Sequence, residues 1–162
     1  MFITVSAMTL SVEVRDNGTG IRAEDMKQLF RRYYTSAAEP SAEQGHGESL
    51  SNLAAIARSV EVTSRHQQST KTFTCKPNPV PGSPTQVTLA KLSRSVGTTV
   101  SVVDLFHRLP VRKTAAQSTL VLARTRDTIG DLSVLWPHVA FVLINQDDGH
   151  ELLHLQNVCS LS

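Results

Sequence analysis

The chain has 162 residues, of which 40% are hydrophobic and 19% charged, as in a globular protein of one domain or of one domain and part of a second. Its most apolar stretch, residues 134–144, contains Pro137 and His138 and is too short to span a bilayer. Two cysteines far apart, Cys75 and Cys159, are too few for a disulfide scaffold or a structural zinc finger. Composition therefore excludes wholesale disorder, a membrane span and a cysteine-held fold, and it favours an intracellular protein.

The net charge of +2 hides an uneven distribution along the chain. Residues 1–61 hold 6 basic and 8 acidic residues, whereas residues 62–126 hold 10 basic residues and a single acid, Asp104. Residues 127–162 hold five acids and no Lys or Arg. The basic middle segment is a candidate for contact with nucleic-acid phosphates, although charge by itself more often marks a solvated surface.

Apolar periodicity predicts the elements of the first third of the chain. Residues 10–15 alternate between apolar and polar side chains, which is typical of a half-buried strand, and this strand ends at a turn signal that begins with Asp16. A helix is predicted over residues 23–34, with helical spacing of Met26, Leu29, Phe30 and Tyr33. A polar loop at residues 37–47 then leads into a second helix that starts near Glu48.

The rest of the chain is predicted to be mostly strand. Strands are expected at residues 60–64, 70–76, 86–90 and 98–103, with a proline-rich loop at 77–84. A helical turn at 105–109 precedes a helix at 114–132, and a hairpin joins 139–145 to 151–156. The predicted fold class is α+β, a two-layer mixed sheet with its helices on one face.

Three segments carry residues suited to binding a nucleotide. In the first, Asp16-Asn17-Gly18-Thr19-Gly20, a carboxylate at the end of a strand can accept a hydrogen bond from an exocyclic amine such as that of adenine. Gly18 and Gly20 permit positive φ and close approach of the backbone to a flat ligand. An ordinary Asp-Asn-Gly turn is the simpler reading of these residues taken by themselves.

The other two segments are a glycine-flanked loop at residues 45–50 and a Gly97-Thr98 pair that enters a strand. The loop opens directly onto a helix, where free backbone N–H groups and the helix dipole favour an anion, although it lacks the lysine of a Walker A motif. Thr98 can bring a hydroxyl beside a ligand held by the first turn.

Taken in order, these segments resemble the MutL family of DNA mismatch-repair proteins within the GHKL ATPase superfamily. The adenine motif, the Arg-Tyr-x-Thr-Ser segment at residues 32–36 and the Gly-Glu-x-Leu pattern at 47–50 all have counterparts in that family. The most diagnostic match is Gly-Thr-x-Val followed by Leu-Phe-x-x-x-Pro-Val-Arg, at residues 97–112. Within the family, the sequence is most similar to the third eukaryotic MutL homologue.

The resemblance implies a Bergerat-type ATPase fold, truncated here, over residues 1–113, and the beginning of a ribosomal-S5-like domain over residues 114–162. It implies ATP as the ligand, a second MutL homologue as a partner, sequence-independent binding of double-stranded DNA, and a nuclear location. The nucleotide-contacting positions that it implies are Asp16, Asn17, Gly18, Gly20, Thr35, Gly45, His46, Gly47, Glu48, Ser49, Leu50, Gly97 and Thr98. The DNA-contacting positions expected in the basic segment are Arg108, Arg112 and Lys113.

One part of the family pattern is missing from the sequence. Family members carry a Glu-x-x-x-Asn helix before the adenine motif, whose Glu activates water and whose Asn binds Mg²⁺, whereas the 15 residues before Asp16 are predicted to be strand. We therefore expect ATP binding without hydrolysis, no resident metal ligand, and a truncated or mis-spliced chain. The alternatives are a non-catalytic remnant that acts through protein contacts, and another GHKL branch, such as a histidine kinase or a chaperone, which residues 105–112 disfavour.

Overall fold

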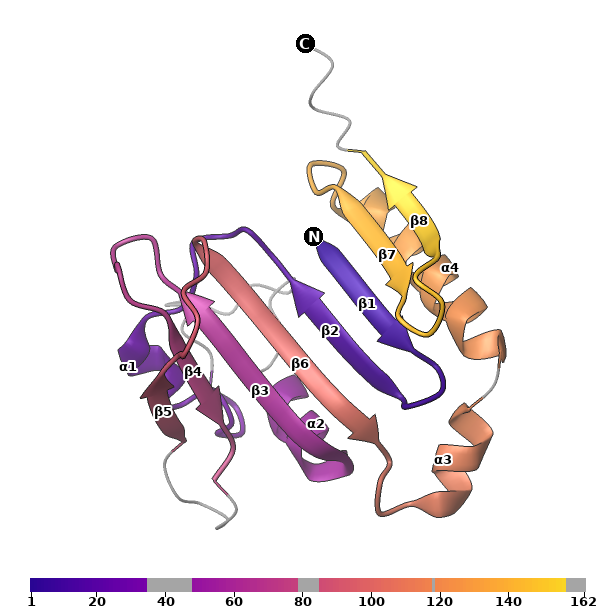
Figure 1. Cartoon of the computed structure of the whole chain (residues 1–162), viewed down its shortest axis with the longest axis horizontal. Helices are drawn as coiled ribbons and strands as arrows, with labels where there is room; N and C mark the ends of the chain where they lie inside the picture. Colours follow the sequence, from indigo (N-terminus) through magenta and orange to yellow (C-terminus); the bar gives the residue numbers. More distant parts are fainter. Residues whose placement is uncertain (35–47, 79–84, 118, 157–162) are drawn as a thin grey trace.

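The computed structural model describes the whole chain except residues 35–47, 79–84, 118 and 157–162. Eight strands form one mixed sheet, in the order β5-β4-β3-β6-β2-β1-β7-β8 (Figure 1). The strands are β1 (Phe2–Ser6), β2 (Ser11–Arg15), β3 (Ala57–Arg65), β4 (Phe73–Lys76), β5 (Gln86–Leu89), β6 (Gly97–Leu105), β7 (Phe141–Asn145) and β8 (Glu151–Leu155). All neighbouring pairs are antiparallel except β1 and β7, which are parallel.

The register of the strands explains where the core lies. One row of mutually paired apolar residues crosses all eight strands on one face of the sheet: Leu153, Leu143, Ile3, Val14, Val100, Val62, Cys75 and Val87. Because side chains alternate between the two faces of a strand, the residues between these positions lie on the opposite face, and they are largely Thr, Ser and charged residues. One face is therefore apolar and the other polar.

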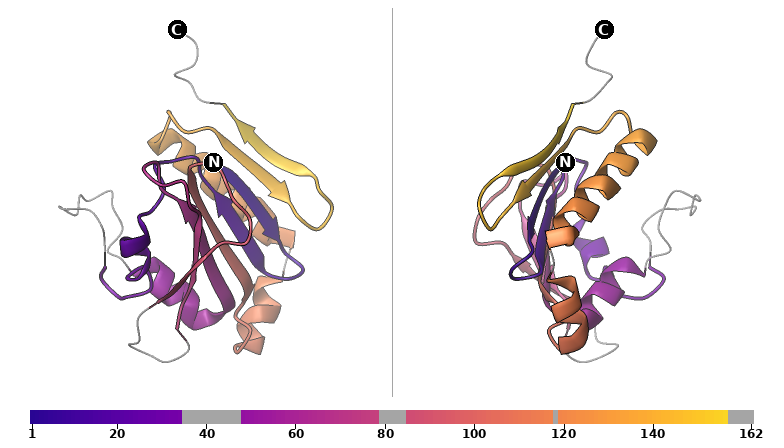
Figure 2. Two further views of the ribbon diagram at one scale, coloured as in Figure 1. Left: turned by 60° about the vertical axis from the view of Figure 1, so that its left-hand side comes forward. Right: turned by 90° about the vertical axis from the view of Figure 1, so that its right-hand side faces the viewer.

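The helices cover the apolar face, as the sequence predicts (Figure 2). They are α1 (Ala23–Met26), α2 (Ser49–Ile56), α3 (Pro110–Ala116) and α4 (Thr119–Leu135). Met26 and Leu50 pack against Val62 and Cys75, and Ile129 of α4 packs against Ile3, Phe141 and Leu143. The predicted α+β class with helices on one face is confirmed.

Two predicted helices differ from those observed. The helix expected over residues 23–34 ends at Met26, because the following amides bond three residues back, Leu29 to Met26 and Arg31 to Gln28, as in successive tight turns. Tyr33, expected on the apolar face, has a φ of 62° and is 70% exposed. The helix expected over 114–132 is two helices, the first of which begins at Pro110, a residue suited to a first helical position.

The expected helical turn at 105–109 is also different, since β6 continues to Leu105 and a turn follows it. The hairpin after α4 is confirmed, and its strand β7 pairs with β1 in the same sheet as the rest of the chain. A division into domains at residue 113 stays a prediction.

Candidate nucleotide-binding site

The Asp16 turn lies at one end of the apolar face of the sheet. Strand alternation puts Asp16 on the same face as Val12 and Val14, so its side chain continues the row that the core residues begin. Its backbone N–H donates to the carbonyl of Thr98 at 2.9 Å. The next residue across the sheet is Ser64, because Thr98 pairs with Ser64 in the β3–β6 ladder. A polar row of Asp16, Thr98 and Ser64 thus closes the core at this end.

The Asp16 carboxylate is held by one of its two oxygens. Its Oδ1 accepts hydrogen bonds from the backbone N–H groups of Gly18, at 2.9 Å, and Thr98, at 3.0 Å. Within the described part of the chain, Oδ2 accepts no hydrogen bond. The carboxylate is therefore oriented by the backbone while it keeps one oxygen for a donor outside the protein, such as an exocyclic amine.

Ser64 is a site residue that we did not predict. It is fully buried, and its Oγ lies 2.8 Å from the Ile21 N–H, 3.0 Å from the Gly97 carbonyl and 3.1 Å from the Thr98 hydroxyl. One small hydroxyl thereby ties the adenine-motif turn to the start of β6. The alternation of residues 60–64 would have put Ser64 on the core face, where a buried hydroxyl needs partners.

Of the predicted site glycines that the structure describes, which are Gly18, Gly20 and Gly97, the last two have the conformation that favours glycine. Gly20 has a φ of 72°, and a Cβ there would lie 2.1 Å from the carbonyl oxygen of Arg65. Gly97 has a φ of 130°, and its Cβ would lie 2.3 Å from the carbonyl oxygen of Asp16. The expectation of positive φ is wrong for Gly18, which makes the short bond to Asp16 without it.

The glycine-flanked loop is described only at its end. Thr35, Gly45, His46 and Gly47 lie outside the described residues, whereas Glu48 and Ser49 begin α2 on the helix-covered face. The Glu48 side chain makes no capping hydrogen bond. Leu50 packs in the same cluster as Ile21, the residue after Gly20, so the start of α2 and the adenine-motif turn share one piece of core. Asn17 is an exposed residue of that turn.

A pocket of about 330 Å³ lies beside this turn, between the start of α1 and the turn after β3. Ile21, Arg22, Glu24, His66 and Phe73 are among its lining residues. Asp16 is not one of them, because its carboxylate lies at the neighbouring end of β2. The pocket is of the size that small ligands use, and it adjoins the residues that orient the carboxylate.

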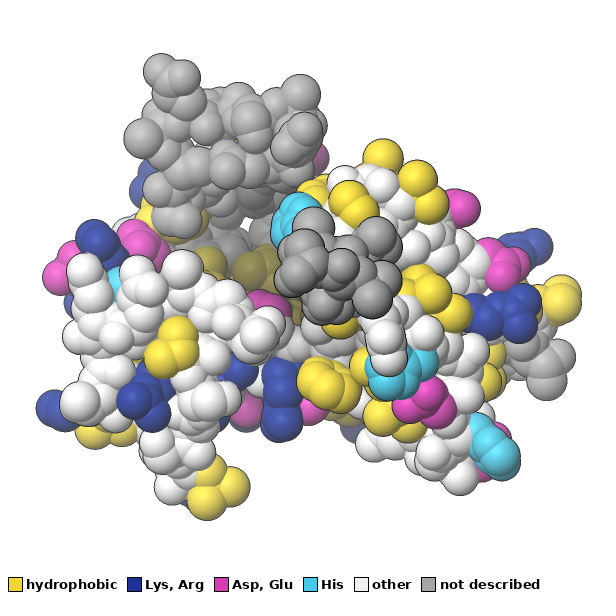
Figure 3. All heavy atoms as spheres, turned by 90° about the horizontal axis from the view of Figure 1, so that it is seen from above, with side chains coloured by type: hydrophobic (Ala, Val, Ile, Leu, Met, Phe, Trp, Pro, Cys, Tyr) yellow, Lys and Arg dark blue, Asp and Glu magenta, His cyan; other side chains and the backbone are white. Residues whose placement is uncertain are grey.

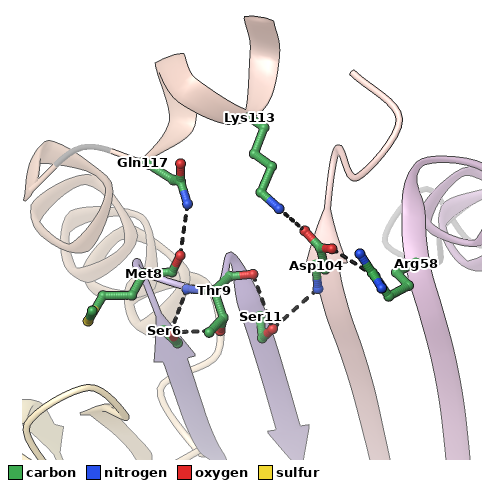
Figure 4. A network of polar contacts seen from close by, with 8 residues as sticks. All are labelled: Ser6, Met8, Thr9, Ser11, Arg58, Asp104, Lys113 and Gln117. Atoms are coloured by element: carbon green, nitrogen blue, oxygen red, sulfur yellow. Dashed lines mark hydrogen bonds and ion pairs between the residues drawn. The ribbon is translucent and has the colours of Figure 1, made fainter. Parts of the chain in front are cut away.

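The predicted DNA-contacting residues lie at the opposite end of the sheet, where β6 leads into α3. Arg108 and Arg112 are exposed, but the Lys113 ammonium bonds the Asp104 carboxylate at 2.5 Å, and the Arg58 guanidinium bonds the same carboxylate at 2.9 Å (Figure 4). The Asp104 side chain is only 13% exposed. Lys113 therefore anchors α3 to the sheet and leaves the two arginines facing solvent.

These two cations also set the behaviour of Asp104 toward acid. The hydrogen bonds from Lys113 and Arg58 hold the pKa of Asp104 below its ordinary value of 3.8. A carboxylate with a lowered pKa in the folded state stabilises the fold above the ordinary value and loses that effect as the pH falls through the lowered pKa. The ion pairs of Asp104 with Lys113 and Arg58 therefore contribute their full stabilisation at neutral pH.

Other chemistry has little support in the described residues. Burial raises the pKa of the Cys75 thiol to about 12, with Glu61 adding to the effect, so this thiol is neutral and unsuited to nucleophilic attack. No three His, Cys, Asp or Glu side chains in the described ranges gather as a metal-ligand set. Over the same ranges no helix has the length and apolarity needed to cross a membrane.

Residues 1–101 match the family model of histidine kinase-, DNA gyrase B- and HSP90-like ATPases. The human DNA mismatch repair protein Mlh3 is 33% identical over 98% of this chain, and MutL of Thiobacillus denitrificans is 32% identical over 83%. The chain spans 12% of the length of the human protein and 23% of the bacterial one.

Solved structures agree on the fold. The Aquifex aeolicus MutL ATPase domain complexed with ADP superposes with a TM-score of 0.68 and 22% identity, covering 96% of this chain and 55% of that one. The N-terminal domain of a DNA repair protein superposes with a TM-score of 0.66 and 28% identity, covering 96% of this chain and 46% of that one. From the ordered motifs, the family match and the shared fold, the chain belongs to the histidine kinase-, DNA gyrase B- and HSP90-like ATPases and, within them, to the MutL family of DNA mismatch-repair proteins.

Proposed function

We propose that this chain binds an adenine nucleotide with Asp16 as the residue that recognises the base. The observation that carries the proposal is the Asp16 carboxylate, whose Oδ1 is fixed by two backbone N–H groups while Oδ2 accepts no hydrogen bond from the described residues. An amine on the base can donate to Oδ2 without disturbing the turn. The solved Aquifex relative is a complex with ADP, which supports the same ligand class here.

The remaining predicted contacts divide between the two ends of the nucleotide. Asn17, Gly18, Gly20, Gly97 and Thr98 belong to the base end, around Asp16. The phosphates are assigned to the residues that lead into α2, whose backbone N–H groups and helix dipole favour anions: Thr35, Gly45, His46, Gly47, Glu48, Ser49 and Leu50.

We expect no ATP hydrolysis by these 162 residues. Glu13 and Asn17 fit the family's Glu-x-x-x-Asn spacing in sequence, but Glu13 lies in strand β2 and its carboxylate accepts a hydrogen bond from the Ser101 hydroxyl at 2.8 Å. Glu13 lies on the polar face of the sheet, opposite the face that carries the Asp16 carboxylate, and Asn17 belongs to the exposed turn after the strand. Glu13 therefore cannot activate water at a nucleotide held by Asp16, and no metal-ligand set in the described residues accompanies it.

Calorimetric titration with ADP and a phosphate-release assay with ATP and Mg²⁺ test this proposal together. The expected result is saturable binding of ADP with phosphate release equal to that of a sample without protein. Phosphate release above that level which disappears in Asp16→Ala would overturn the expected loss of hydrolysis. Absence of ADP binding by a folded sample would overturn the proposal itself.

A second proposed function is weak, sequence-independent binding of double-stranded DNA. It is supported by the exposure of Arg108 and Arg112 around the start of α3, in a segment with 10 basic residues and one acid. Cations that contact phosphates release counterions, so the affinity for DNA must fall as the salt concentration rises.

By family membership we also propose a second MutL homologue as the partner and the nucleus as the location.

The DNA prediction concerns the double variant Arg108→Ala/Arg112→Ala. If both arginines contact phosphates, the variant reduces the slope of log affinity against log salt by about two and weakens binding to all duplexes alike. Fluorescence anisotropy with two unrelated duplexes, at about 50 mM and about 200 mM salt, measures this. Arg31→Ala/Arg32→Ala, which removes two exposed arginines outside the basic segment, is the charge-matched control. Affinity that does not change with salt would contradict the proposal.

A further inference from the structure

We propose that Arg94 is a positioning residue that holds the Asp16 turn and thereby sets the affinity and base selectivity of the site. The inference rests on the proposed nucleotide-binding function. Arg94 belongs to the loop between β5 and β6 and lines a groove of about 680 Å³ on the helix-free face, together with Arg15, Thr63 and Thr99. It thus approaches the Asp16 turn from the side opposite the core.

The Arg94 guanidinium joins two strands that are not neighbours. Its Nη2 donates to the carbonyl oxygen of Asp16 at 2.9 Å, and its Nη1 donates to the carbonyl oxygen of Thr63 at 3.1 Å. Asp16 follows β2 and Thr63 belongs to β3, with β6 lying between them in the sheet. A planar guanidinium with several fixed donors is suited to such a bridge, because each N–H has a set direction.

Gly97, the first residue of β6, leaves the space for this bridge. A Cβ on Gly97 would lie 2.3 Å from the Asp16 carbonyl oxygen and 3.0 Å from the Arg94 Nη2. The absence of a side chain at Gly97 therefore lets the guanidinium reach the carbonyl. The Gly97-Thr98 pair thus has two roles. The Thr98 N–H donates to the Asp16 carboxylate, and the absence of a side chain at Gly97 leaves room for Arg94 to reach the Asp16 carbonyl.

Both backbone groups of Arg94, its N–H and its carbonyl, are hydrogen-bonded. Its N–H donates to the Thr72 hydroxyl at 3.2 Å, and its carbonyl accepts a hydrogen bond from Arg65 Nη1 at 3.0 Å. Burial lowers the pKa of the Arg94 guanidinium and the Asp16 charge opposes that shift, but an arginine stays protonated at any physiological pH. The side chain is a fixed, charged donor to the Asp16 carbonyl. Seen from above in Figure 3, the basic side chains of the molecule are dispersed among polar, acidic and hydrophobic ones.

A fixed carbonyl at Asp16 fixes the direction of its carboxylate. The peptide that carries this carbonyl precedes Asn17 and Gly18, and the Gly18 N–H is one of the two donors to Oδ1. Without Arg94, the Asp16–Asn17 peptide can rotate, both bonds to Oδ1 weaken, and Oδ2 no longer keeps one direction. A mobile carboxylate still attracts a nucleotide weakly but distinguishes poorly between an amine and a carbonyl on the base.

The test compares Arg94→Ala with Lys91→Ala, an exposed residue of the same loop that makes no ion pair among the described residues. Titrations with ADP and IDP measure affinity and selectivity, since the two bases differ at position 6 in having an amine or a carbonyl. Amide hydrogen exchange followed by NMR, without nucleotide, measures protection of the Gly18 and Thr98 N–H groups. Arg94→Gln, which keeps most of the side-chain length, serves as a second variant should the alanine variant fold poorly.

The expected result for Arg94→Ala is ADP affinity about tenfold lower, a smaller ratio of ADP to IDP affinity, and faster exchange at Gly18 and Thr98. Lys91→Ala should match the unmodified protein in all three. General destabilisation would lower both affinities equally, so the ratio separates positioning from stability. Unchanged exchange at Gly18 and Thr98, or an unchanged ratio, would overturn the role of Arg94. Failure of the unmodified protein to bind ADP, with exchange still faster in the variant, would overturn the nucleotide proposal and leave the structural role of Arg94 standing.

Discussion

Asp16→Ala should reduce the affinity for ADP by about 100-fold, the largest loss expected from any single substitution at the base end of the site. The substitution removes the oxygen offered to the base, and it also removes the acceptor for the N–H groups of Gly18 and Thr98. A hydrogen bond to a charged group contributes about 1.5–3 kcal/mol, which corresponds to a factor of about 10 to 150 in affinity. Calorimetric titration of both proteins measures the difference.

Asp127→Ala is the matched control for Asp16→Ala. Asp127 is a carboxylate on α4 that forms a surface ion pair with Arg126 at 3.1 Å. Its replacement by alanine changes the net charge by the same amount as Asp16→Ala. We expect its ADP affinity to equal that of the unmodified protein. An Asp16→Ala protein that binds ADP as tightly as this control, with an unchanged circular dichroism spectrum, would contradict the assignment of Asp16 to the base.

Gly97→Ala should lower the free energy of unfolding by about 3 kcal/mol or more and the Tm by roughly 10 °C. The φ of 130° at Gly97 is unfavourable for any residue with a Cβ, and the new methyl would lie 2.3 Å from the Asp16 carbonyl oxygen. Gly97 begins β6 and Asp16 directly follows the neighbouring strand β2, so relief of the overlap requires the two strands to separate at this end. Thermal unfolding followed by circular dichroism measures the change.

Gly130→Ala provides the opposite expectation in the same protein. Gly130 lies within α4, its φ is not positive, and a Cβ there would have no atom within 4 Å. Alanine is favoured over glycine inside a helix by about 1 kcal/mol, so this variant should be as stable as the unmodified protein or more stable. Equal Tm values for Gly97→Ala and Gly130→Ala would show that the close approach at Gly97 is absent in solution.

Strand alternation predicted most of the sheet because one face of it is buried. Strands were predicted at residues 10–15 and 98–103, and β2 and β6 contain all of these residues except Leu10. The turn after β2 and the glycines Gly20 and Gly97 were also predictable, since their residue types are needed locally. The assignment of this turn to the base of a nucleotide stays a prediction.

What the sequence did not predict depends on contacts between distant residues. Ser64 and Arg94 contribute to the Asp16 turn from 48 and 78 positions away along the chain, and neither has a local motif that marks it. Lys113 was predicted to contact DNA because it clusters with Arg108 and Arg112, and this stays a prediction, but its ion pair with Asp104, nine positions earlier, could not be read from the sequence. Helix α1 also ends earlier than predicted, at Met26, although Leu29 and Phe30 still pack in the same cluster as Met26 and Val62.

The parallel pairing of β1 with β7 has a consequence for how the chain folds. β1 lies at Phe2–Ser6 and its partner at Phe141–Asn145, and β2 pairs with residues about 90 positions later in β6, Val12 with Val102. Strand pairs between residues this distant in sequence form slowly, because closing the intervening loop costs conformational entropy before the contacts between the strands can offset it. During synthesis the β2 edge of the β1–β2 hairpin therefore stays unpaired until β6 has emerged from the ribosome about 90 residues later, and the β1 edge until β7 has emerged about 140 residues later. Until then this hairpin is a strand pair open to intermolecular pairing, a state in which chaperone protection would matter most.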